Sequence, residues 1–329
     1  MSNLRYFVKR TVVTALLIFL VASALFLLFR SLPGSYLDIL VARGANAEEL
    51  EAAQEAWGLN DPLYVQYFEY ITNLFTGDMG NSFRYRTPVI NVVGEAILNS
   101  FLLVAPAITV AYIVGSIFGG FLGRNRGSKK ERRGVAGITI LGTIPEFFLG
   151  IFLLIIGAFW FGIFPTGGMS SVQNSGLSTL EMVQTGDFWL HYALPFLTIV
   201  AKLVYLPSLI MRTSVVEISG QDFMTYHRLK GLPETRQLRH MLKHASLPVI
   251  TLYPISMGRA IGGMVIVETV FNWPGVGFLL VESVFQRDLP VVQFVFFLVA
   301  VWVIVGNYLV DIVYSIIDPR VVVEGQDSD

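Results

Sequence analysis

Six long apolar stretches alternate with polar segments along the chain. A hydrocarbon core of about 30 Å requires about 20 helical residues, and each stretch reaches that length. The pattern therefore predicts an all-α, polytopic membrane protein with six transmembrane helices. We place the helices near residues 11–30, 98–122, 135–163, 191–211, 246–270 and 293–317.

The longest polar segment, residues 31–97, has helical signals of its own. Asn46 followed by Glu49 has the form of a capping box, in which the two side chains satisfy backbone amides at a helix start. Asp61-Pro62 favours the start of a second helix, which we expect to end near Gly77. The segment is therefore predicted to be a small helical cap. It either packs over the helix ends or docks an extracytoplasmic partner.

A second polar segment, Gln221 to Pro248, lies between two apolar stretches, and its charged residues are mostly Lys and Arg. Gly231 interrupts two helix-compatible pieces. Apolar residues recur at helical spacing in the second piece, which predicts an amphipathic helix. Such a segment is suited to binding another protein, but a solvated linker or a helix lying on the lipid surface would show the same pattern. The apolar positions are Leu238, Met241, Leu242 and Ala245.

The distribution of Lys and Arg predicts the orientation. With the N-terminus inside, the inner segments hold sixteen of the 23 basic residues and the outer segments hold four. Cytoplasmic loops are enriched in basic residues, so both termini are predicted to be cytoplasmic. No small-residue cleavage site clearly follows the first apolar stretch, and we interpret it as a retained helix rather than a removed signal peptide.

We divide the chain into four parts. Residues 1–30 form the N-terminal tail and first helix, and 31–97 form the extracytoplasmic segment. Residues 98–320 hold the other five helices, with the cytoplasmic loop at 212–245. An acidic tail follows at the C-terminal end, at 321–329.

Composition agrees with a membrane protein and excludes several chemistries. The chain is 54% hydrophobic and 14% charged, with a mean hydropathy of +0.62, which is too apolar for an ordinary soluble domain. The net charge of −1 gives no indication of nucleic acid binding, and the absence of cysteine excludes disulfides and thiolate sites. His240 and His244, one helical turn apart, could share a metal but are more typical of a polar surface.

Catalytic signatures are absent from the sequence. It contains no phosphate-binding loop, no H-E-x-x-H and no G-x-S-x-G. We therefore expect no enzymatic activity, no metal and no cofactor bound by this chain. ATP, if it is used, must be bound by other subunits.

Two features predict how the membrane helices pack and bend. Gly115, Gly119 and Gly123 recur every four residues, which allows another helix to approach closely. Pro145 lies inside the third apolar stretch and should kink it, because proline removes a helical hydrogen bond.

Three charged residues, Glu146, Lys202 and Arg259, fall near the middle of predicted spans. Charges at that depth are costly and usually face a partner or a wet cavity. They either form a buried structural ion pair or cluster, line a substrate path, or mark an error in our boundaries. We predict that Glu146 lies within ion-pair distance of Lys202 or Arg259.

Several segments, taken in order, resemble the inner-membrane permease of dipeptide/oligopeptide ABC importers (the DppB/OppB type). The similarity runs nearly end to end. It includes the segment at 58–83, TIPEFFLGIFLL at 143–154, VETVFNWPGVGFLLVESVFQRDLPVVQ at 267–293 and LVDIVYSIIDPR at 309–320. The opening residues and Ser31 to Gly34 are also similar to that family's start.

The resemblance implies that the loop at 212–245 is the EAA-type loop, whose short coupling helix inserts into a cleft of a cytoplasmic ATPase subunit. Tyr226 and His227 are bulky where the family usually has small residues, which suggests an ATPase cleft matched to this permease. Charges at Glu146 and Arg259 also depart from many relatives. The residues that the resemblance assigns to coupling are Gln221, Asp222, Phe223, Tyr226, Arg228, Lys230 and Gly231.

The resemblance further implies a set of partners. They are a second, homologous permease, two ATP-binding subunits that hold ATP and Mg²⁺, an extracytoplasmic solute-binding protein and the lipid bilayer of a prokaryotic cell membrane, with no nucleic acid. Peptides are the expected cargo. The same type of importer also carries oligosaccharides or nickel chelates. Two alternatives come from other classes. An ion-coupled carrier would use Glu146, and the loop at 212–245 argues against it. An intramembrane enzyme would need paired Asp, a His-rich metal site or Ser–His at membrane depth, and none is evident in the sequence.

Overall fold

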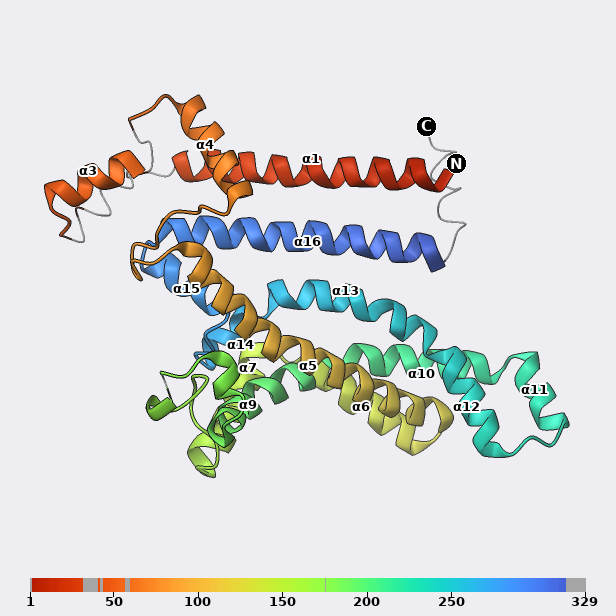
Figure 1. Ribbon diagram of the computed structural model, residues 1–329. Helices are drawn as coiled ribbons and strands as arrows, with labels where there is room; N and C mark the ends of the chain where they lie inside the picture. Colours follow the sequence, from red (N-terminus) through yellow and green to blue (C-terminus); the bar gives the residue numbers. More distant parts are fainter. Residues whose placement is uncertain (1, 32–40, 42–43, 57–59, 175, 318–329) are drawn as a thin grey trace. The chain divides into compact units, whose positions relative to one another are not determined.

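The computed structural model describes residues 2–31, 41, 44–56, 60–174 and 176–317 (Figure 1). Helices dominate this described part of the chain, in agreement with the predicted all-α polytopic membrane fold. The predicted acidic tail at the C-terminal end lies outside the described residues.

The chain forms two compact units. The first consists of Met1–Leu98 together with Gly275–Asp329, and the second of Asn99–Pro274. The chain passes from the first unit to the second inside the long helix α5 (Val89–Arg124) and returns after Pro274.

In the first unit, two long helices, α1 (Ser2–Ser31) and α16 (Leu289–Ile317), lie side by side. Helix α4 (Leu63–Thr76) crosses α1 rather than running along it (Figure 1). The unit also contains α3 (Ala47–Ala56) and α15 (Val276–Phe285). Both helices of the outer segment predicted from the sequence are therefore present.

Local signals placed the ends of α4 correctly. Pro62 precedes its first residue, and Gly77 ends it in the left-handed conformation with φ of 80°. Its amide donates to the Asn73 carbonyl, as in a typical glycine-terminated helix.

One core of the first unit lies where the start of α5 meets α15 and the start of α16. Aliphatic side chains from these helices are buried together and exclude water, which is the main stabilising term at such a contact. The buried members are Val89, Val93, Ala96, Val276, Leu279, Val291, Phe294 and Val295.

A buried carboxylate secures the turn next to this core. Asp288 is fully buried at the start of α16. Its oxygens accept hydrogen bonds from Ser82 Oγ at 2.5 Å, from the Phe83 amide at 3.0 Å and from the Arg84 amide at 3.2 Å. This interaction fixes the turn between α4 and α5 against the turn between α15 and α16.

The second unit holds the rest of α5 and eleven shorter elements in the described part. The first seven are α6 (Lys129–Thr143), α7 (Glu146–Leu154), the π-helix η1 (Ile155–Trp160), the 3₁₀ helix η2 (Val172–Asn174), α8 (Thr179–Met182), α9 (Gly186–Leu203) and α10 (Tyr205–Ser219). The remaining four are α11 (Asp222–Leu229), α12 (Glu234–Ala245), α13 (Leu247–Gly263) and α14 (Val265–Val270).

Four described helical stretches are long and apolar enough to cross a membrane. They are Phe7–Ser31, Val89–Arg124, Gly186–Ser219 and Leu289–Leu309. The pair α6 and α7 would make a fifth span, but it is bent by 97° at the predicted proline kink. The predicted span at 246–270 is divided between α13 and α14, so the count of six is not established.

The glycines of α5 permit the close approach that their spacing predicted. A methyl group at Gly115 would lie 2.9 Å from the Val204 carbonyl oxygen, and one at Gly123 would lie 2.8 Å from the Arg212 carbonyl oxygen. Both distances are shorter than normal van der Waals contact. Helix α5 therefore lies directly against α10 and the turn before it, with backbone touching backbone.

Candidate functional site

The break between α6 and α7 creates two helix ends inside an apolar helix pair that forms either a broken span or a re-entrant loop. Helix α6 ends at Thr143, Ile144 and Pro145 are extended, and α7 begins at Glu146. The last carbonyls of a helix carry partial negative charge and its first amides partial positive charge. The break therefore presents one site for a cation and one for an anion at neighbouring positions.

The described side chains show no ion pair between Glu146 and Lys202, and each of the two residues lies at a helix end. Lys202 Nζ donates to the carbonyl oxygens of Gly142 at 3.0 Å and Ile144 at 2.8 Å, at the end of α6. Glu146 is the acidic residue in the first turn of α7. Among the described side chains it makes no ion pair.

The alternative partner for Glu146 stays a prediction. The backbone of Arg259 belongs to α13, but its side chain lies outside the described residues. The pairing of Glu146 with Arg259, and the path-lining role of all three charges, are therefore expectations from the sequence.

The loop predicted to be cytoplasmic contains the two helical pieces that the sequence indicated. Helix α11 ends at Leu229, and α12 begins after Pro233. Gly231 lies in the turn between them with φ of 65°, a conformation that side chains with a Cβ rarely adopt. Space around its Cα is open, so backbone conformation rather than packing requires glycine here. Helix α10 continues to Ser219, beyond our expected loop boundary at 212.

Helix α11 presents an exposed surface at one end of the second unit (Figure 1). The Tyr226 and Leu229 side chains are 63% and 79% exposed, and Lys230 Nζ lies 5.7 Å from the centre of the Tyr226 ring. Gln221 and Asp222 are also exposed. These five residues form what we call the α11 knob, with Gly231 at its end. The Arg228 side chain lies outside the described residues.

The opposite side of α11 packs against α12 through aromatic contacts. The Phe223 ring lies 5.2 Å from the His244 ring and 5.6 Å from the His227 ring, centre to centre. His227 in turn lies 4.9 Å from His240. Met224 is buried below them. Phe223 is thus a support for the knob rather than part of its exposed surface.

Two ion pairs connect the loop region to the helices next to it. Arg124 at the end of α5 pairs with Glu234 at the start of α12. Glu131 in α6 accepts from the Arg212 guanidinium of α10, with 2.9 Å from Nε to Oε1, and from the Gly127 amide. Since Glu131 is buried, its pair holds α10 rigidly against the turn between α5 and α6.

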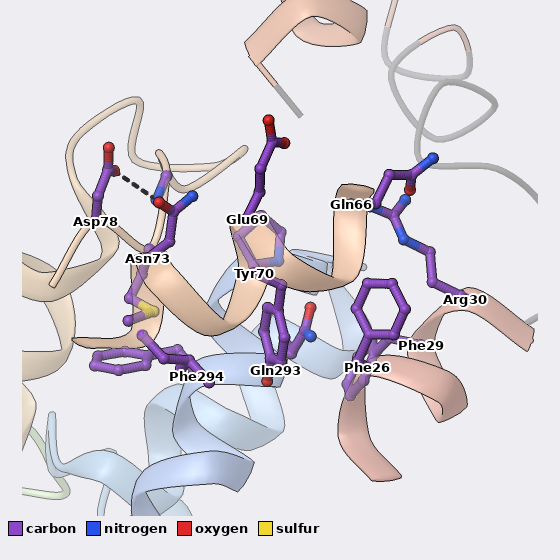
Figure 2. Close-up of a pocket in the computed structure, with 14 residues that line it drawn as sticks. Phe26, Phe29, Arg30, Gln66, Glu69, Tyr70, Asn73, Asp78, Gln293 and Phe294 are labelled. Carbon is purple, nitrogen blue, oxygen red and sulfur yellow. Dashed lines mark hydrogen bonds between the residues drawn. The ribbon is translucent and has the colours of Figure 1, made fainter. Parts of the chain in front are cut away.

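A separate cavity of about 120 Å³ lies in the first unit. Figure 2 shows Tyr70 and Gln293 near its centre, Phe26 and Phe29 on one side of them, Phe294 on the other side, and Glu69 pointing away. Burial raises the pKa of the Tyr70 phenol, and Gln293 beside it acts in the opposite direction. Pockets that enclose drug-sized ligands measure roughly 300–1,000 Å³. This cavity is therefore too small to be a transport site for such cargo.

A group of buried polar residues near the end of α14 was not identified from the sequence. Glu268 in α14 is buried and accepts a 2.6 Å hydrogen bond from Ser100 Oγ in α5. Nearby, Trp273 Nε1 donates to the Asn99 carbonyl at 2.9 Å, and Asn99 Nδ2 donates to the Pro274 carbonyl at 3.0 Å. The only sequence feature of Glu268 is its place within one turn of the end of an apolar stretch. Ordinary polar residues at the end of a membrane helix show the same feature, so the sequence does not distinguish them.

The sequence has extensive matches among known proteins. Residues 111–323 match the family described as "Binding-protein-dependent transport system inner membrane component", and residues 3–97 match the N-terminal region of such components. The oligopeptide transport system permease protein AppB of Bacillus subtilis is 33% identical over 320 residues, covering 96% of this chain and 98% of that protein. The glutathione transport system permease protein GsiC of Escherichia coli K12 is 33% identical over 321 residues, covering 97% and 99%.

Proposed function

The chain belongs to the family of inner-membrane components of binding-protein-dependent transport systems, and on that premise we propose that it forms half of the translocation path of a peptide importer. A permease of this kind works with a solute-binding protein and ATPase subunits. We further propose that a second, homologous permease forms the other half of the path. Two ATP-binding subunits would carry out all ATP hydrolysis.

Peptides are the proposed cargo. The observation that carries this assignment is similarity over almost the whole chain to two permeases named for oligopeptides and for glutathione, itself a small peptide. The alternatives, oligosaccharides and nickel chelates, rest on the importer type alone. No residue of the described structure favours them.

The α11 knob is the proposed contact with an ATPase subunit. Its aromatic and aliphatic tips, Tyr226 and Leu229, are exposed side by side on one short helix, which is typical of an interface surface. The ion pairs of Arg124 and Arg212 connect the loop region to α5 and α6. Movement of a bound ATPase would therefore be passed to membrane helices as rigid-body displacement.

The break between α6 and α7 is the proposed path-lining region of this half. Irregular backbone at membrane depth is tolerated where it is buried in protein or borders a water-filled cavity. Glu146 and Lys202 occupy the two helix ends there, and Arg259 is the third proposed member. We also propose that both termini and the α11 knob are cytoplasmic, and that residues 31–97 face the solute-binding protein.

Reconstitution tests the proposal. The chain is co-expressed with its candidate second permease and ATPases, purified as a complex and placed in liposomes with the solute-binding protein. We expect ATP hydrolysis to rise when the binding protein is loaded with di- or oligopeptides, and not with oligosaccharides or a nickel chelate. Stimulation by a sugar or a nickel chelate alone would overturn the peptide assignment. Failure to co-purify with any ATPase would overturn the importer assignment.

A further inference from the structure

Helix α4 is amphipathic in a way that its packing uses only in part. At about 100° per residue, its apolar side chains other than Val65 cover an arc of roughly 160°. One half of this arc faces α1 and the cavity, through Tyr67, Tyr70 and Leu74. The other half is exposed.

The exposed half is large and aromatic. Tyr64 is 67% exposed, Phe68 is 66% exposed and Phe75 is 85% exposed. The arc on the opposite side of the helix is polar and includes Gln66, Glu69 and Asn73. Exposed aromatic surface of this extent on a helix outside the spans requires an explanation, because single exposed apolar residues are common but an aligned set is not.

Contacts with α1 fix the depth of α4 relative to the membrane. The Tyr67 hydroxyl bonds Ser23 Oγ at 2.6 Å, and the Tyr67 ring lies 5.3 Å from Phe26. Ser23 is eight residues before the end of the span Phe7–Ser31, or about 12 Å along the helix. That span is about 37 Å long, so it extends about 4 Å beyond a centred 30 Å hydrocarbon core at each end.

The contact at Ser23 therefore lies about 8 Å inside the hydrocarbon boundary. Interfacial amphipathic helices bury their apolar face about 5–10 Å into the boundary between headgroups and acyl chains, which agrees with this depth. Arg30, whose guanidinium lies 5.6 Å from the centre of the Phe26 ring, is then at headgroup level, where a long basic side chain reaches water.

We propose that α4 is an interfacial membrane helix embedded in the outer leaflet, and that Tyr64, Phe68 and Phe75 are in contact with lipid acyl chains. Because α4 crosses α1 in Figure 1, it lies near the plane of the bilayer with its polar arc toward water. The helix then holds the outer end of α1 at a fixed depth. A docking surface for the solute-binding protein is the competing explanation for the same residues.

Site-directed spin labelling tests this directly, since the chain contains no cysteine. Phe68→Cys and its matched control Glu69→Cys are labelled with a nitroxide in the full importer, with cysteine-free partner subunits. The complex is placed in nanodiscs of phosphatidylethanolamine and phosphatidylglycerol. Collision with oxygen, which concentrates in lipid, is compared with collision with a water-soluble nickel complex. We expect the oxygen-to-nickel ratio to be several-fold higher at position 68 than at 69.

Phe75→Cys and Asn73→Cys repeat the comparison one or two turns away, so the test survives if one variant fails to assemble. The inference is overturned if the ratio is the same at all four positions, or if position 68 is shielded from both reagents. It is also overturned if adding the solute-binding protein removes oxygen access at position 68, since the surface would then be a protein dock. These outcomes do not depend on which cargo the importer carries.

Discussion

Substitution of Gly119 by alanine should separate α5 from α10. The added methyl group would lie 2.9 Å from the Ser208 carbonyl carbon and 3.0 Å from Met211 Cβ, and closer still to the Ser208 carbonyl oxygen. Backbone cannot rotate away as a side chain tip can, so the helices must move apart. Overpacking of this kind costs about 1–3 kcal/mol, and the gain in helix propensity returns about 0.5–1 kcal/mol. We expect a net loss on the order of 1–2 kcal/mol in the free energy of unfolding.

Thermal unfolding in nanodiscs, followed by circular dichroism, measures this loss. A cost of 1 kcal/mol lowers the melting temperature of a domain of 150–250 residues by about 2–4 °C. Gly137→Ala is the matched control, because a methyl group there meets no atom within 4 Å. It should leave the melting temperature unchanged or raise it. Equal melting temperatures for the two variants would refute the close packing of α5 on α10.

Three further predictions follow from individual contacts. Lys202→Met should cost about 1–3 kcal/mol, seen as a lower melting temperature, because two carbonyls at the end of α6 lose their donor; an unchanged value would show that these contacts are not made. Asp288→Asn should lower the melting temperature by a similar or larger amount, because it replaces a charged acceptor of three hydrogen bonds. An unchanged melting temperature would contradict this account of the turn. Reversing Glu48 and Glu51 to Lys should slow binding-protein association at low salt more than at high salt; indifference to both would make the outer segment only a packing cap.

Sequence signals were sufficient wherever the cause was local. Pro62 and Gly77 set the ends of α4 through their own backbone restrictions, and Gly231 requires a left-handed turn whatever surrounds it. The four-residue spacing of Gly115, Gly119 and Gly123 predicted a close helix contact, because a helix face without side chains lets another backbone approach. Long apolar stretches also predicted membrane helices, since bilayer thickness fixes the necessary length.

The arrangement of charged residues could not be predicted in this way. The sequence indicated that Glu146 and Lys202 lie at similar depth, but not that the break at Pro145 would supply helix ends for both. Glu268 and Asp288 were missed because their partners lie in segments distant in the sequence, a helix for Glu268 and a turn for Asp288. Ion pairing and burial are tertiary properties, and spacing along one helix does not determine them.

The central claim is that α11 couples this permease to ATP hydrolysis, and peptide uptake measured together with ATP consumption tests it most directly. Gly231→Val places a β-branched side chain at φ of 65°, whereas Gly231→Asn keeps a residue that tolerates this conformation. In proteoliposomes containing ATP and peptide-loaded binding protein, we expect Gly231→Asn to retain most peptide uptake. Gly231→Val should assemble in the membrane but lose uptake per ATP hydrolysed. Equal uptake per ATP by both variants at equal expression would contradict coupling through this turn.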